Sequence, residues 1–300
     1  MLDSDIEISV VVPIYNSADI IPILVDRIEH TIKQLGLSFE ILLSEDCSAD
    51  NSWSVIQELS VHNKAIKGIR LSKNCGQWVS TLAGISKARG KYIVTIDDDM
   101  EYEPSYIAMM YNTIKDNKYQ VVFGIPTDKY ILQGKNNFLS KTRKKLMHVL
   151  WNSPVTDSFR IIKREVVLTE NNILIPNVFI DAYLVNNIDR RFIGYLETRS
   201  NPRYAGVSNV NFFKKVKLFL LYRSHFKVSN EFAVFLTAAQ SIVLVAFLKF
   251  MFYKNFSYLF SIAFFLIMWG FLYIEAFMKL HWKDSKHILF LVVDEVNISS

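Results

Sequence analysis

Residues 92–99 read Y-I-V-T-I-D-D-D, a short apolar run that leads directly into three aspartates. Apolar, β-branched runs of this length are typical of buried strands. Similar runs occur at 8–14 (I-S-V-V-V-P-I), 39–43 and 66–71, and a segment with helical spacing follows each of these three. Because parallel strands require crossover connections, this alternation predicts an α/β fold with a doubly wound, mostly parallel sheet.

The helices are placed by apolar spacing and by residues that begin or end helices. The first has isoleucine or leucine at 20, 24, 28 and 32, with Asn16 and Ser17 as its expected caps and Gly36 at its end. Two more helices are expected through 53–59 and over 79–88. Further strands are predicted at 119–125, 158–162 and 191–197.

Acidic residues follow two of these predicted strands. Glu45 and Asp46 come after the second strand, and the aspartates of the opening stretch come after the fourth. Because ligands of such folds bind beyond the carboxyl ends of the strands, we expect a functional site at this edge of the sheet. Carboxylates at alternate positions, Asp97, Asp99 and Glu101, can hold Mg²⁺, which takes its other ligands from phosphates and water. A solvated turn is the alternative interpretation of three acids in a loop.

The last third of the chain is more apolar than the rest. Hydrophobic residues make up 51% of the 300-residue sequence, and charges rarely interrupt them beyond Asn230. The segments 234–253 and 256–274 are each long enough to cross about 30 Å of hydrocarbon as a helix. The short link between them predicts a two-helix transmembrane hairpin, and the basic residues on both flanks place those flanks in the cytoplasm. Two buried helices of a soluble domain are the alternative.

The stretch 211–229 before the hairpin is basic and amphipathic. Phe212, Val216 and Phe219 share one helical face, and lysines crowd the remainder, which is typical of a helix in the membrane interface. A surface helix of the catalytic domain is the alternative. The net charge of +5 comes without a nucleic-acid-binding pattern, so an anionic lipid surface is favoured and nucleic acid is not expected as a partner.

The expected organisation is a catalytic domain over 1–210, a juxtamembrane helix over 211–229, two transmembrane helices over 230–279 and a cytoplasmic tail over 280–300. Within the tail, 288–293 is expected either to add a strand or to lie on the membrane. The two cysteines, Cys47 and Cys75, lack metal-ligand spacing and are expected to be free thiols. The first residues lack the pattern of a secretory leader.

Five motifs in residues 8–104 have the order and spacing of a known family. They are V-V-V-P-I-Y-N (10–16), S-E-D-C-S-A-D (44–50), L-S-K-N-C-G-Q (71–77), A-G (83–84) and D-D-D-M-E-Y-E-P (97–104). The chain resembles family 2 glycosyltransferases with the GT-A fold. Within that family it is most similar to the polyprenyl-phosphate branch, which includes dolichol-phosphate mannose synthase and undecaprenyl-phosphate sugar transferases. The resemblance implies a mixed, mostly parallel sheet.

Two later segments resemble the same branch more faintly, and a C-terminal membrane hairpin is common in it. The segments are T-D-S-F-R-I (156–161) and R-Y-A-G-V-S-N (203–209). They imply that Arg160 and Arg203 contact phosphates, a task that suits the planar guanidinium, and they assign Ser208 to substrate binding.

The resemblance also assigns the donor site. It implies that Pro13 and Tyr15 line the base and ribose pocket, and that Glu45 or Asp46 binds the base. It further implies that Asp97 and Asp99 hold the metal and the diphosphate, with Glu101 as a third metal ligand where the branch often has glutamine.

Four residues depart from the pattern of the branch, and one of them, Glu45, stands where the branch has aspartate. Cys47 and Ala49 stand where it usually has glycine and threonine, so the identity of the base stays open among UDP, GDP and dTDP. Asn209 stands where it has lysine, a role that Lys214 or Lys215 could take.

A lipid phosphate is already anionic at neutral pH, so it can attack the anomeric carbon without a strong base. If a base is used, Asp157 is the first candidate and Asp181 the second. A structural role, as a loop cap or arginine partner for Asp157, is the alternative for both.

The resemblance implies an inverting transfer of a sugar from a nucleoside diphosphate sugar, preferably UDP-linked, to polyprenyl phosphate. Mg²⁺ or Mn²⁺ is the implied cofactor. The expected setting is the bacterial inner membrane, multi-pass with a cytoplasmic catalytic domain, in cell-envelope polysaccharide biosynthesis; formation of a homo-oligomer stays open.

Two other functions remain open. One is extension of a lipid-linked saccharide or surface polysaccharide at a hydroxyl, which requires a general base. The other is a non-catalytic subunit that binds sugar nucleotides, against which the intact Asp97 and Asp99 argue.

Overall fold

A computed structural model of the chain describes residues 6–116, 118–126, 158–168, 180–199, 201 and 292–298. All of these residues belong to one of the two compact units into which the chain divides. The predicted juxtamembrane helix and both predicted transmembrane segments lie outside the described residues. Within the described part of the chain, no helix is both long enough and apolar enough to cross a membrane.

The described residues form one mixed sheet in the order β7-β5-β6-β4-β1-β2-β3-β8. The strands are β1 (Ile8–Ile14), β2 (Phe39–Glu45), β3 (Ile66–Leu71), β4 (Tyr92–Thr95), β5 (Val121–Pro126), β6 (Arg160–Lys163), β7 (Ile193–Thr198) and β8 (Val292–Val296). The first four strands pair in parallel, whereas β6 is antiparallel to both β4 and β5, and β8 is antiparallel to β3. The α/β class and the mostly parallel sheet expected from the sequence are therefore confirmed.

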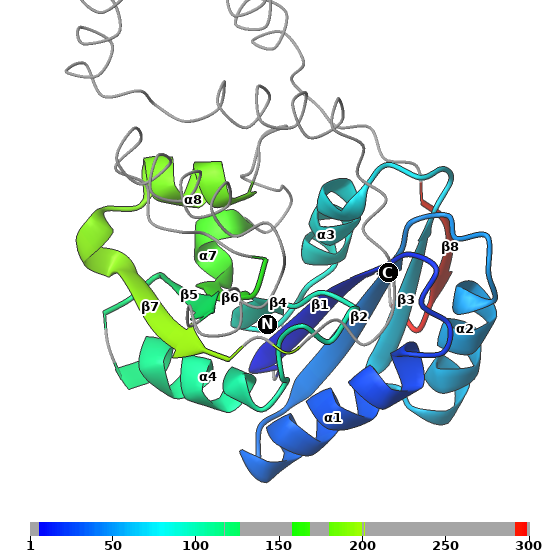
Figure 1. The fold of residues 1–300 in the computed structure, drawn as a ribbon, viewed down its shortest axis with the longest axis horizontal. Helices are drawn as coiled ribbons and strands as arrows, with labels where there is room; N and C mark the ends of the chain where they lie inside the picture. Colours follow the sequence, from blue (N-terminus) through cyan, green and yellow to red (C-terminus); the bar gives the residue numbers. More distant parts are fainter. Residues whose placement is uncertain are drawn as a thin grey trace, which may run out of the picture. The chain divides into compact units, whose positions relative to one another are not determined.

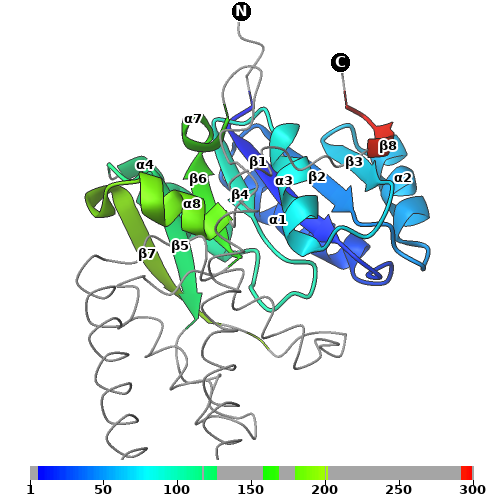
Figure 2. The same cartoon turned by 90° about the horizontal axis from the view of Figure 1, so that it is seen from above.

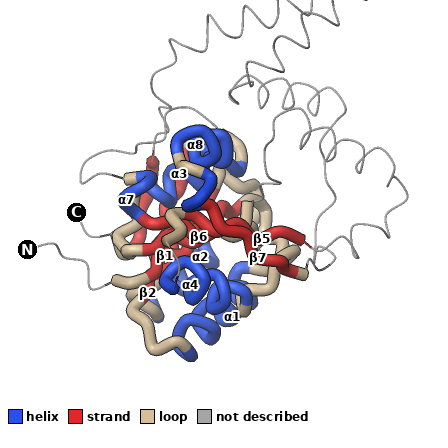
Figure 3. Tube along the Cα trace, turned by 90° about the vertical axis from the view of Figure 1, so that its left-hand side faces the viewer, coloured by secondary structure: helices blue, strands red, loops and turns tan. Residues whose placement is uncertain are grey.

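Helices cover both faces of the sheet. They are α1 (Ile21–Gln34), α2 (Ser52–His62), α3 (Gln77–Ser86), α4 (Tyr106–Asp116), α7 (Arg164–Val167) and α8 (Ile180–Asn187), with a short 3-10 helix, η1 (Arg190–Phe192). Figure 1 shows α1, α2 and α4 on one face and α3, α7 and α8 on the other. Figure 3 shows the same three layers from the side, with the strands between the two groups of helices.

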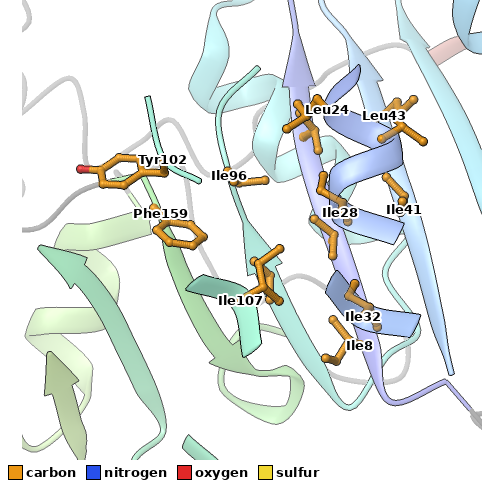
Figure 4. Packing of buried hydrophobic residues seen from close by; sticks show 14 of the residues in the cluster. Ile8, Leu24, Ile28, Ile32, Ile41, Leu43, Ile96, Tyr102, Ile107 and Phe159 are labelled. Atoms are coloured by element: carbon orange, nitrogen blue, oxygen red, sulfur yellow. The ribbon is translucent and has the colours of Figure 1, made fainter. Parts of the chain in front are cut away.

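The core forms because the central strands are apolar on both faces. Alternate residues of β1 and β2 point to opposite sides, so Val10 and Leu43 join one cluster while Val11 and Leu42 join the other. Figure 4 shows Leu24 and Ile28 of α1 packed toward the strands of the first cluster. Burial of each such side chain contributes about 1.5–3 kcal/mol relative to exposure, so this packing holds the strand ends in fixed register.

The start of α1 differs from the prediction. Its N-cap is Ile20, which makes no side-chain capping bond, and Pro22 occupies the first turn. The carbonyl of Ser17 accepts from the N–H groups of Ile20 and Ile21 at 2.9 and 3.2 Å. The side chains of Asn16 and Ser17 instead bind neighbouring loops, as described below. Gly36 ends the helix as predicted, with a φ of 66°.

The direction of the strands defines the functional edge of the sheet. Because β6 runs against its neighbours, its first residue, Arg160, lies beside Thr95, the last residue of β4. The carboxyl ends of the parallel strands and the start of β6 therefore meet at one edge, which Figure 2 shows from above. The predicted strand at 158–162 begins two residues later than expected.

Candidate active site

The loops that leave β1 and β4 are joined through Asp98. Its Oδ2 accepts hydrogen bonds from the backbone N–H of Tyr15 at 3.1 Å and from the hydroxyl of Ser17 at 2.5 Å. Burial raises the pKa of Asp98 above its ordinary value, against the opposing effect of these two donors. Asp98, which the sequence did not single out from its neighbours, thus fixes the backbone of the first loop.

The loop after β2 is tied to the same first loop. The Asn16 N–H donates to Ser48 Oγ at 3.0 Å, and Asn16 Oδ1 accepts from the Ala49 N–H at 2.9 Å. Glu45 is fully buried below this loop, where one carboxylate oxygen accepts from the Ser48 N–H. Its other oxygen lies 3.1 Å from Nε of Arg70, at the end of β3.

Asp46 connects β2 with the start of α3. Its side chain is only 2% exposed, and its two oxygens accept from the N–H groups of Cys75 and Gly76, each at 2.7 Å. Burial raises the pKa of Asp46, and the two N–H groups act against that shift. Glu45 is thus held by a hydrogen bond and an ion pair, and Asp46 by two hydrogen bonds, so both carboxylates bind groups within the protein.

Asp97 and Asp99 follow β4 at the functional edge, and both are half-buried. Asp97 Oδ1 accepts from Nε2 of Gln77 at 2.6 Å, and its Oδ2 accepts from the Ser158 hydroxyl at 2.7 Å. Asp99 Oδ1 accepts from the Glu101 N–H at 3.0 Å. The sequence did not indicate that Gln77 and Ser158 bind Asp97, although Gln77 ends the motif at 71–77 and Ser158 lies in the segment 156–161.

The three predicted metal ligands, Asp97, Asp99 and Glu101, follow β4 in one loop. No three His, Cys, Asp or Glu side chains among the described residues lie close enough together to hold one ion. The role of Asp97, Asp99 and Glu101 as metal ligands stays a prediction. Between Asp99 and Glu101, Met100 has left-handed backbone with a φ of 55°.

Arg160 is placed differently from the prediction. It is 6% exposed, donates through Nε to Thr95 Oγ1 at 3.0 Å, and forms an ion pair with Asp181 of α8. Since a buried charge requires a partner, the pair supports a structural role for both residues. Arg160 as a phosphate ligand and Asp181 as a base would each have to leave this pair.

A model of the glycosyl transferase family 2 matches residues 9–168, which is more than half of the chain. The chain belongs to this family. It is therefore an enzyme that transfers sugars, and all five motifs that resemble the family lie within the matched residues. The match covers the family as a whole and does not identify the polyprenyl-phosphate branch.

Solved structures with this fold include two kinds of synthase. Mannosyl-3-phosphoglycerate synthase from Rubrobacter xylanophilus is 14% identical over 73% of this chain and 72% of its own, with a TM-score of 0.57. Glucosyl-3-phosphoglycerate synthase from Mycobacterium tuberculosis, in complex with Mn²⁺, UDP-glucose and phosphoglyceric acid, is 15% identical over 74% and 81%, with a TM-score of 0.56. At these identities the likeness establishes the fold, including the GT-A-like mixed sheet.

The remaining predicted residues of this family 2 glycosyltransferase fall into two groups. Pro13 is buried within β1, and the side chain of Tyr15 is 49% exposed at the rim. Asp157, Arg203 and Ser208 lie outside the described residues, so their predicted roles stay predictions.

Proposed function

We propose that this glycosyltransferase moves a sugar from a UDP-sugar to the phosphate of a polyprenyl lipid at the cytoplasmic face of a membrane. The observation that carries the donor half is the meeting of four segments at one edge of the sheet, where Asp98 binds Tyr15 and Ser17 while Asp97 binds Gln77 and Ser158. Such an edge is where nucleotides bind in open α/β sheets.

The carboxylates at this edge suit one divalent cation that is shared with a diphosphate. Gln77 and Ser158 orient Asp97, because each donates a hydrogen bond to one of its two carboxylate oxygens. Mg²⁺ and Mn²⁺ need only one or two protein carboxylates when phosphates and water complete the coordination. When bound, such a cation would neutralise charge on the departing diphosphate.

The similar structures support a nucleotide-sugar donor and a divalent cation. They do not identify the nucleotide or the metal that this chain uses. The mycobacterial synthase was crystallised with Mn²⁺ and UDP-glucose. Tyr15, exposed at the rim and held at its backbone by Asp98, is placed to pack against a base or ribose. We therefore propose UDP as the nucleotide.

The acceptor half rests on the sequence. The long apolar segment 234–253, whose one charged residue is Lys249, and the uncharged segment 256–274 have basic flanks, and together they favour an acceptor dissolved in a membrane. Asp157 directly precedes Ser158, whose hydroxyl binds Asp97, so residue 157 is next in the chain to a group at the site. With a phosphate acceptor, Asp157 would serve to position groups; with a hydroxyl acceptor, it would have to remove a proton.

The test is transfer of labelled sugar from UDP-sugars to polyprenyl phosphate in detergent with Mn²⁺. The proposal expects a product that extracts into organic solvent and is released by mild acid. Asp99→Ala should abolish turnover, and the exposed Asp116→Asn at the end of α4 should not change it. Label that enters only water-soluble or acid-stable glycan, together with complete loss in Asp157→Asn, would establish the hydroxyl acceptor instead.

A further inference from the structure

The C-terminal segment of the chain completes the sheet on the side of the donor site. Strand β8 pairs with β3, and Asp294 lies opposite Arg70 in the register. The side-chain amide of Asn297 donates to the carbonyl oxygens of Ser60 and Ile66, and Glu295 forms an ion pair with Lys87 at 2.7 Å. Residues 292–298 are therefore anchored at several points to the catalytic unit.

One of these anchors leads toward the candidate donor site. Asp294 Oδ2 accepts the indole N–H of Trp53 at 3.1 Å, and Trp53 is buried. The guanidinium of Arg70 lies 5.8 Å from the centre of the Trp53 ring, within the range of a cation–π contact. A buried indole N–H needs an acceptor, so Asp294 fixes the ring against which Arg70 packs.

Arg70 continues the connection into the loop after β2. Its Nε lies 3.1 Å from Glu45, whose carboxylate is fully buried and binds the Ser48 N–H. A buried carboxylate depends strongly on its cationic partner, so the position of Arg70 controls the conformation of Glu45 and of the loop 46–48. That loop also contains Asp46, which binds the start of α3.

We propose that Asp294 is a positioning residue for nucleotide binding, acting through Trp53 and Arg70 on Glu45 and the loop 46–48. The inference rests on the proposed donor site. It predicts that the C-terminal strand influences affinity for the donor although Asp294 has no place in the site itself. By linkage, nucleotide binding must stabilise β8 by the same free energy.

The test compares two changes on the same strand. Asp294→Ala removes the acceptor for Trp53, whereas Glu295→Ala removes the ion pair to Lys87, which does not lead to the loop. With Mn²⁺ present, Asp294→Ala should weaken UDP binding by about three- to tenfold, and Glu295→Ala by less than about twofold. Asp294→Asn should restore affinity, because its amide oxygen can accept the indole N–H. Loss of affinity in both alanine variants in proportion to their loss of melting temperature would overturn the inference.

A second measurement needs no nucleotide. Hydrogen exchange at the Ser48 amide should be faster in Asp294→Ala than in the parent protein, and unchanged in Glu295→Ala. Suppose that no nucleotide binds to the parent, but exchange at the Ser48 amide is faster in Asp294→Ala. The proposed function then fails, while the structural connection from Asp294 to the loop 46–48 stands. Suppose instead that nucleotide binds, but Asp294→Ala changes neither its affinity nor the exchange rate of the Ser48 amide. The connection from Asp294 to the loop 46–48 then fails, while the proposed function stands.

Discussion

Three residues with left-handed backbone turn the chain out of the parallel strands and into the site. Asn16, Cys47 and Met100 have φ angles of 53°, 55° and 55°, and they follow β1, β2 and β4. Asparagine tolerates this region, whereas other side chains lose about 1–2 kcal/mol in it. The cysteine at 47 stands where the family resemblance has glycine, so the departure read from the sequence coincides with a strained backbone.

Replacement of Cys47 by glycine should therefore stabilise the protein. Glycine removes the left-handed penalty but loses more chain entropy on folding, so the net gain should be about 0.5–1 kcal/mol, or roughly 2–4 °C in melting temperature. Cys47→Ala is the matched control, because it removes the thiol and keeps the strain. Thermal unfolding of both variants measures the difference; a glycine variant no more stable than the alanine variant would contradict the strain.

The raised pKa of Asp98 gives a pH-dependent prediction. A carboxyl whose pKa is raised in the folded state binds more protons there than in the unfolded state, so its contribution to stability falls as pH rises from 3.8 to the folded pKa. Asp98→Asn keeps an oxygen that can accept from Tyr15 and Ser17 but never ionises. Its melting temperature should exceed that of the parent by about 2 °C at pH 7, and the difference should shrink toward pH 4.

The two melting temperatures must be compared in the nucleotide-free protein, because a ligand bound at this edge of the sheet would itself raise the melting temperature. Asp99→Asn serves as a control, because Asp99 Oδ1 accepts a hydrogen bond from the Glu101 N–H within its own loop. A melting temperature for Asp98→Asn that is lower than the parent's at pH 7 would show that the ionised form is the favoured one.

At the scale of elements, sequence pattern located the strands that are apolar on both faces. The strands at 8–14 and 66–71 have the predicted limits, because a buried parallel strand is a continuous apolar run. Helix α4 was not predicted, although its buried residues Ile107, Met110 and Ile114 repeat at helical spacing. The reversed direction of β6 could not be inferred from its sequence, since burial gives parallel and antiparallel core strands the same apolar pattern.

The packing of α3 on β1 depends on the absence of a side chain at Gly84. A Cβ at this position would lie 2.4 Å from Cγ1 of Val11, closer than atoms can approach. Gly84→Ala should therefore destabilise the protein by about 1–3 kcal/mol, even though alanine favours a helix more than glycine does. It should also weaken UDP binding, because the start of α3 holds Asp46 and its Gln77 binds Asp97.

A second substitution checks the cause of that loss. Val11→Ala makes room beneath the helix, so the pair Gly84→Ala and Val11→Ala should be less destabilised than the sum of the two single changes. Additive losses, measured by denaturant unfolding, would mean that the helix is not displaced by the contact with Val11.

For the whole molecule, the sequence located the edge of the sheet but not the contacts within it. The sequence predicts that Asp46 and Asp97 lie at the same edge of the sheet, because the carboxyl ends of parallel strands share one edge. The bond from Ser158 to Asp97 and the pairing of Arg160 with Asp181 joined segments far apart in the chain. Only tertiary packing sets such pairings, so the motif predicted a phosphate contact for Arg160 but could not predict its ion pair with Asp181.

The opposite edge of the sheet carries a buried polar cluster of its own. Glu40 is 1% exposed and forms an ion pair with the buried Lys67, while its other oxygen accepts from Ser9 Oγ at 2.6 Å and the Arg89 N–H at 2.7 Å. These residues lie near the amino ends of β1, β2 and β3, a full strand length from the loops of the site. This buried cluster therefore lies at the edge of the sheet opposite to the proposed donor site.

Glu40→Gln tests this separation. It leaves the Lys67 charge buried without its carboxylate, which should cost about 3–5 kcal/mol and lower the melting temperature by roughly 10 °C. The double variant with Lys67→Met should recover part of the loss, because an apolar pair avoids the buried charge. UDP affinity, measured well below the melting temperature, should stay within about twofold of the parent's, since the donor loops keep their own contacts. A fall in affinity that follows the fall in stability would mean that the two edges act as one unit, and that the register of the central strands transmits changes across the sheet.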